Sequence, residues 1–128
     1  MIGITYPNVK SVKILWKNNS VNPIGAFNVS FESPAKYDMY LITYVEYDAG
    51  SFNQISTFVN ENIFKTGATM KEDANGSGYP AGEGNQYSRK ATLSSDNKMV
   101  AFTNGYYSGN HGSNEHSCIP TAIYGINL

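Results

Sequence analysis

The sequence has little cysteine, little charge and no long apolar run. Its single cysteine, Cys118, excludes an internal disulfide and fits synthesis in a reducing compartment. Only 15% of the residues are charged and the net charge is -1, so no basic stripe could neutralise phosphates, and we expect no nucleic-acid partner. No run approaches the roughly 18 apolar residues that span a bilayer, and the N-terminus lacks a signal-like core. We therefore expect neither membrane insertion nor a cleaved leader.

Leucine and alanine are also scarce, whereas the 128 residues include ten Tyr, twelve Gly and many Asn, Ser and Thr. This composition disfavours helices and favours strands joined by turns. It suits a surface that binds through hydroxyls, amides and aromatic rings, although Tyr and Asn also simply accompany β-rich folds. The length predicts one domain, residues 9–128, preceded by a tail or linker at residues 1–8.

The longest strand-like run is YDMYLITYVEYD, residues 37–48. Alternate side chains of a strand point to opposite faces. One face, which we expect to form the core, holds Met39, Leu41, Thr43 and Val45. The other face is aromatic at its middle, with Tyr40, Ile42 and Tyr44. A second layer is expected to cover it, formed by a second sheet, by the domain's own loops or by another subunit.

Other alternating segments predict further strands around this run. Residues 9–17 place Val12, Ile14 and Trp16 on one buried face, with Trp16 as a core anchor, and residues 27–32 alternate cleanly between apolar and polar. Residues 87–93 and 98–103 predict a hairpin, and residues 118–126 a closing strand. Segment 51–64 fits a strand or a helix, of which we favour the strand, and a short strand is expected at 64–70. The fold class predicted is an all-β, antiparallel, jelly-roll-like β-sandwich of seven or eight strands.

Two long polar segments, residues 71–86 and 104–117, are predicted to be exposed loops. Aromatic rings and amides are the groups that hold polar, sugar-like ligands or protein surfaces. The ligand-binding candidates on these loops are Tyr79, Tyr106, Tyr107, Asn110, His111 and Asn114. The alternative is that the loops are only connectors.

Metal, cofactor and nucleophile signals are weak in this sequence. Residues 76–81 imitate a dinucleotide-binding glycine pattern, but Pro80 disfavours the helix that the motif needs. His111 and His116 are too few ligands for a metal site. Cys118 lacks an identifiable orienting group and is expected to be a small buried residue. We therefore expect no metal and no cofactor.

One carboxylate pair resembles a catalytic arrangement in spacing alone. Glu46 and Asp48 lie on one strand face, about 7 Å apart, a distance compatible with an inverting glycosidase. They end a strand beside a turn, where acidic residues are normally solvated. The sequence thus predicts that the protein is not an enzyme.

Four blocks of the sequence, read together, resemble a known family. They are VKILWKNNS, YDMYLITYVEYD, YSRKATLSSDNKMVAFTNGYY and the closing CIPTAIYGI. In this order they look like the C-terminal module of tail-fibre and minor structural proteins in bacteriophages and prophages of gut bacteria, over residues 9–126. The resemblance does not extend to the loops and brings no catalytic residues. It implies a virion-associated β-sandwich, commonly trimeric, near the end of a fibre that touches the host surface.

From this resemblance we expect a virion protein, made in the host cytoplasm, that binds a cell-surface glycan or protein and contacts other virion proteins. A homotrimer would place Tyr40, Ile42 and Tyr44 at the subunit interface. Such modules normally follow a long shaft, whereas only a few residues precede the first strand here. Two alternatives remain: a purely structural head-fibre or decoration protein, and a glycan-cleaving enzyme.

Overall fold

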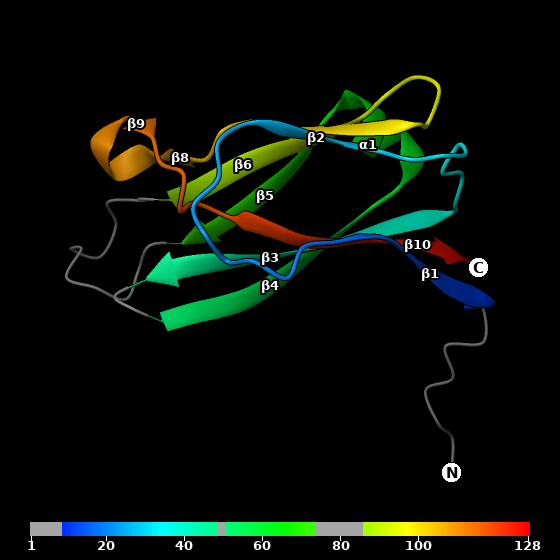
Figure 1. Cartoon of the computed structure of the whole chain (residues 1–128), viewed down its shortest axis with the longest axis horizontal. Helices are drawn as coiled ribbons and strands as arrows, with labels where there is room; N and C mark the ends of the chain where they lie inside the picture. The colour runs from blue at the N-terminus through cyan, green and yellow to red at the C-terminus, as the bar shows by residue number, and fades with distance from the viewer. Residues whose placement is uncertain (1–8, 49–50, 74–85) are drawn as a thin grey trace, which may run out of the picture.

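Two antiparallel β-sheets pack face to face in the computed structural model, which describes residues 9–48, 51–73 and 86–128 (Figure 1). The four-stranded sheet has the order β1 (Ser11–Lys17), β10 (Ile119–Asn127), β3 (Met39–Asp48) and β4 (Ser51–Val59). The six-stranded sheet runs β2 (Phe27–Ser30), β7 (Met99–Phe102), β6 (Gln86–Leu93), β8 (Tyr106–Tyr107) and β9 (Gly112–Ser113), and β5 (Ala68–Asp73) also pairs with β6. A short helix, α1 (Glu61–Thr66), connects β4 to β5, and a 3-10 helix, η1 (Ser108–Asn110), lies between β8 and β9.

The predicted all-β antiparallel sandwich is confirmed, with ten strands in the described residues instead of seven or eight. Two of the extra strands, β8 and β9, are two-residue pairings inside the segment expected to be a loop. The first strand pairs with the last, and β2 pairs with β7. The predicted tail at residues 1–8 and the glycine pattern at 76–81 lie outside the described residues.

The main hydrophobic core lies on the Tyr40 face of β3, which corrects the expected orientation of this strand. Tyr40 and Ile42 are fully buried and Tyr44 nearly so, within a cluster that includes Phe64 of α1 and Met70 of β5. The chain's own second sheet therefore covers this face. The assignment of Tyr40, Ile42 and Tyr44 to a subunit interface is wrong for this fold, because these residues are at most 3% exposed within the single chain.

The opposite face of β3 looks outward from the sandwich. Met39 and Leu41 on this face are only half-buried. Both faces of the strand are apolar, so alternation alone could not decide which one meets the second sheet. For this reason the prediction that the Met39 face forms the core was wrong at Met39 and Leu41, whereas Thr43 and Val45 on the same face are buried, at 8% and 6% exposed.

A β-bulge changes the orientation of β1. Register with β10 shifts between Ile14 and Trp16, which inserts one extra residue and breaks the period-two alternation. Trp16 consequently points inward and packs against Phe27 and Phe102, with ring centroids 5.8 and 5.9 Å away. This confirms Trp16 as a core residue, whereas Val12 and Ile14, expected on the same buried face, are 58% and 56% exposed.

Segment 51–64 contains both of the structures that its pattern allowed. β4 continues to Val59, and α1 then begins after Asn60, whose side-chain Oδ1 accepts a hydrogen bond from the Ile63 N–H at 2.9 Å. Phe64 anchors the helix in the core through an edge-to-face contact with Tyr40. The strand expected at residues 64–70 begins only at Ala68, and it extends through residues 71–73, which had been assigned to a loop.

Candidate functional site

The segment from residue 104 to 117 lies at one end of the six-stranded sheet, where Figure 1 shows β8 and β9 beside the start of β6. β8 pairs with β6 through Tyr87–Tyr107 and Ser88–Tyr106, and with β9 through Tyr106–Ser113. The predicted loop is thus a small hairpin added to the sheet. Hydrogen-bonded pairing gives it a defined shape that an irregular connection would lack.

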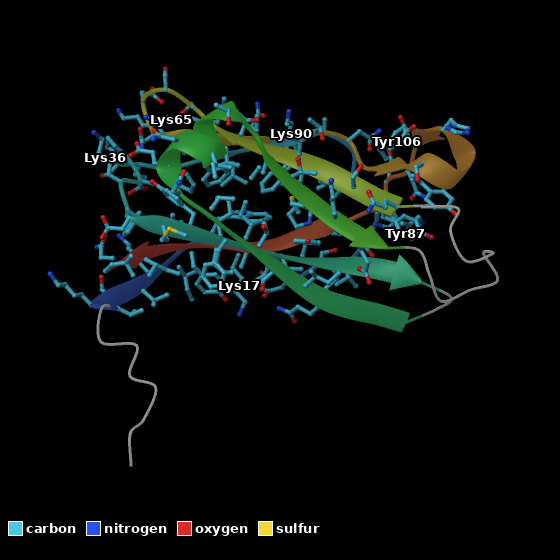
Figure 2. The ribbon with its side chains drawn as sticks, turned by 180° about the vertical axis from the view of Figure 1, so that it is seen from behind. Lys17, Lys36, Lys65, Tyr87, Lys90 and Tyr106 are labelled. Carbon is cyan, nitrogen blue, oxygen red and sulfur yellow. The ribbon has the colours of Figure 1, made fainter. Side chains whose placement is uncertain are left out.

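Tyr106 and Tyr107 were both ligand-binding candidates, but neighbouring residues of a strand point to opposite faces. Tyr106 is 41% exposed, and Figure 2 shows it at the β8–β9 end. Tyr107 is buried and stacks on Tyr87 with ring centroids 4.6 Å apart. The structure therefore corrects the prediction for Tyr107, which supports the hairpin from within.

The remaining loop candidates differ in their surroundings. His111 is exposed and adopts the left-handed backbone conformation at φ 53°, where its N–H donates to the Ser108 carbonyl at 3.2 Å. Asn114 is half-buried, and its Oδ1 accepts a hydrogen bond from the His116 N–H at 2.9 Å, so it shapes the turn. The side chain of Asn110 and all of Tyr79 lie outside the described part of the structure. Among the described candidates, Tyr106 and His111 are the exposed ones.

A buried arginine fastens this end of the molecule, and sequence reasoning missed it. Arg89 of β6 is 2% exposed, and its guanidinium donates six hydrogen bonds to backbone carbonyls. These carbonyls come from three separate stretches of chain, at residues 24–25, 103 and 115–118. The planar guanidinium reaches all six because it carries five N–H donors in a fixed fork, and the single Nε–H is shared between the Ser117 and Cys118 carbonyls.

Arg89 remains a cation at neutral pH. Burial lowers its pKa to about 10, which is still far above 7. The carbonyl oxygens replace the water that the charge loses on burial. One signal for this role was present in the sequence, because Arg89 is the only arginine and stands at an inward position of an alternating strand, between Tyr87 and Ala91.

Gly105 allows the hairpin to close over Arg89. A Cβ at this position would lie 2.1 Å from the Asn114 carbonyl oxygen and 3.0 Å from the guanidinium. Any side chain here would force the hairpin away from its anchor. Arg89 and Gly105 together hold the backbone on which Tyr106 and His111 stand.

A cleft of about 300 Å³ lies at the opposite end of the sandwich. Its walls combine the rings of Phe31 and Tyr37 with Lys13, Glu32 and two serines, Ser30 and Ser33. This mixture of apolar rings and a few polar groups is typical of small-ligand sites, and the volume is at the lower limit for such sites. Sequence reasoning did not find the cleft because its residues come from β1, β2 and the following connection.

Cys118 is fully buried, and its thiol lies 3.5 Å from the Met70 carbonyl oxygen, which confirms the prediction of a small buried residue. Within the described ranges, no group of three or more His, Cys, Asp or Glu side chains is placed to hold a metal ion. Glu46 and Asp48 lie near the end of β3, and their side chains are not part of the described structure. None of the described helices is long and apolar enough to cross a membrane.

Comparisons of the chain with protein-family models, curated proteins and solved structures found no match.

Proposed function

We propose that the chain is a non-enzymatic structural module of a bacteriophage virion that binds a host cell-surface glycan or protein through the β8–β9 hairpin. The observation that carries this proposal is the exposed ring of Tyr106, presented on a backbone that Arg89 fixes with six hydrogen bonds. The family resemblance supplies the virion context and the expectation that the module works as a homotrimer.

A fixed backbone favours recognition because binding then costs little ordering of the loop. Tyr106 offers a rigid aromatic face and a hydroxyl, and His111 adds a second polar ring on the same short hairpin. Stacking on such a ring and hydrogen bonding at its edge suit a sugar or a polar protein surface. Repetition of the site in an oligomer would strengthen weak single contacts through avidity.

A purely structural virion module is the second candidate. The exposed apolar residues on the outer side of the four-stranded sheet, Val12, Ile14 and Phe58, favour it, because they suit contacts with protein. In this alternative the hairpin has no ligand, and the module connects or decorates other virion proteins.

Glycan arrays of bacterial surface polysaccharides, probed with the wild type, Tyr106→Ala and Tyr37→Ala, test the proposal. We expect Tyr106→Ala to weaken binding at least about tenfold, since it removes an exposed aromatic contact. Tyr37→Ala changes the distant cleft and should leave binding intact. Loss of binding in Tyr37→Ala alone would place the ligand in the cleft, and no binding by an intact oligomer would favour the structural module. Neighbouring genes for tail or capsid proteins would test the virion context.

A further inference from the structure

The outer face of the four-stranded sheet carries an unbroken apolar row. Directly paired residues share a face, and the register aligns Ile14 of β1 with Tyr124 of β10, Leu41 of β3 and Phe58 of β4. Leu41 lies opposite in direction to the buried Tyr40 and Ile42, so the whole row points away from the second sheet. The row crosses all four strands.

The two ends of this row are the most exposed. Ile14 is 56% exposed and Phe58 is 60% exposed, and Val12 beside Ile14 is 58% exposed. Tyr124 and Leu41, between them, are half-buried. A charged side chain on this face, Lys17, lies at the end of β1, and Figure 2 shows it below the sheet. The centre of the face is therefore neutral and apolar.

We propose that further copies of this chain associate through this outer face. The area agrees with such a contact: four strands at about 4.8 Å spacing and seven residues at about 3.3 Å rise give roughly 450 Å² of flat surface per copy. Side chains that stand up from the sheet add to this figure. Two such faces bury about 900 Å², which is smaller than the roughly 1,200 Å² of standard specific interfaces, so we expect a weak association, in the micromolar range.

Charge favours a second copy as the occupant of the face. A neutral surface can meet itself without opposing like charges, whereas a strongly charged partner would find no complementary group at its centre. With a symmetry axis parallel to the strands, the β1 edge of one copy meets the β4 edge of the next. Ile14 then lies close to Phe58 of the neighbouring copy in a twofold or a threefold assembly.

This inference rests on the proposed function only in expecting an assembly of identical chains. It replaces the interface first assigned to Tyr40, Ile42 and Tyr44 with the opposite face of the same strand. Binding at the β8–β9 hairpin is measured separately, because Tyr106 lies on the other sheet. A monomeric variant that still binds glycan would thus test recognition without assembly.

Light scattering after size-exclusion chromatography tests the inference with the full chain. We expect wild type to assemble at micromolar concentration and Phe58→Lys to raise the dissociation constant at least tenfold, because a desolvated cation would face an apolar neighbour. Ile63→Lys is the matched control, since Ile63 is 51% exposed on α1, outside this face. It should assemble like wild type. A wild type that stays monomeric at about 100 µM, or an unchanged Phe58→Lys assembly, overturns the proposal. Circular dichroism checks that both variants fold.

Cysteine cross-linking locates the contact independently. Ile14 and Phe58 stand three strand spacings apart in one chain, about 14 Å, which is too far for an internal disulfide. In the double variant Ile14→Cys and Phe58→Cys, we expect oxidation to give closed covalent dimers or trimers on a non-reducing gel. Native Cys118 is fully buried, so the single variants serve as controls for background oxidation. No increase over these controls would contradict the arrangement.

Discussion

The outer faces of the two sheets differ in chemistry. On the six-stranded sheet, exposed side chains of β5 and β6 are polar, including Thr69, Lys71 and Lys90, and Figure 2 shows Lys90 on this side. On the four-stranded sheet, the exposed side chains include Ile14 and Phe58. A polar outer face is stable in water by itself, whereas covering an apolar face lowers the free energy of the protein. This contrast supports the two proposals, recognition at the six-stranded sheet and assembly through the four-stranded sheet.

The largest loss of stability is expected on substitution of Arg89, the buried cation of the six-stranded sheet. Arg89→Met removes the donors to six carbonyls in a buried site and should lower the free energy of unfolding by at least about 3 kcal/mol. Urea unfolding measures this change. Lys90→Met, on the exposed side of the same strand, should stay within about 0.5 kcal/mol of wild type. An Arg89→Met protein of wild-type stability would contradict the anchoring role of this side chain.

The next-largest effect is the difference in stability loss when isoleucine is replaced by alanine on the inner and on the outer side of the four-stranded sheet. Ile42→Ala opens a cavity in the core and should cost about 2–4 kcal/mol of unfolding free energy. Ile14→Ala, on the outer face, should cost less than about 0.5 kcal/mol. Thermal or urea unfolding at low protein concentration separates these values from any contribution of assembly. Equal losses at the two positions would mean that the outer face is also part of the folded core.

The smallest expected effect is on the loss of stability at acid pH, to which Glu61 contributes. Hydrogen bonding to Asn97 at 2.6 Å, together with Lys65 at 3.0 Å, lowers the pKa of Glu61 below its usual 4.5. The ionised carboxylate is thus favoured in the fold, so its contribution is present above about pH 4.5 and is lost as the pH falls through the lowered pKa. Glu61→Gln should reduce this acid-dependent loss, by less than about 1 kcal/mol because the pair is partly exposed.

Unfolding at pH 3 and pH 7, for wild type and Glu61→Gln, measures that difference. Asp96→Asn is a useful comparison, because the Ser94 hydroxyl likewise lowers the pKa of Asp96. Assembly through the neutral outer face should change little over pH 5 to 7. A steep pH dependence of assembly in that range would contradict the apolar contact.

Much of the fold was predictable because local patterns and tertiary packing agree. The alternation at residues 27–32, the hairpin around residues 95–97 and the closing strand all appear where the pattern places them. The candidate site was less predictable. Tyr106 and Tyr107 are identical in chemistry, and only the pairing of β8 with β6 decides which one is exposed.

The role of Arg89, a buried polar residue, was likewise hard to predict from the sequence. Its partners are carbonyls from residues 24 to 118, and the backbone carbonyl is common to every residue type. Nothing in their side chains marks those positions in the sequence. The role of the arginine therefore depends on the meeting of distant segments.

The class of fold could be predicted from local patterns, because period-two alternation and turn residues act locally and need no partner. The same patterns predicted that Tyr40, Ile42 and Tyr44 are covered. Packing between the two sheets set what covers these residues and which face of β3 turns away from the second sheet, since both faces of β3 are apolar and a single bulge reverses part of β1. Whether a residue is buried depends on what packs against it, and for these three residues the covering side chains belong to the opposite layer of the sandwich.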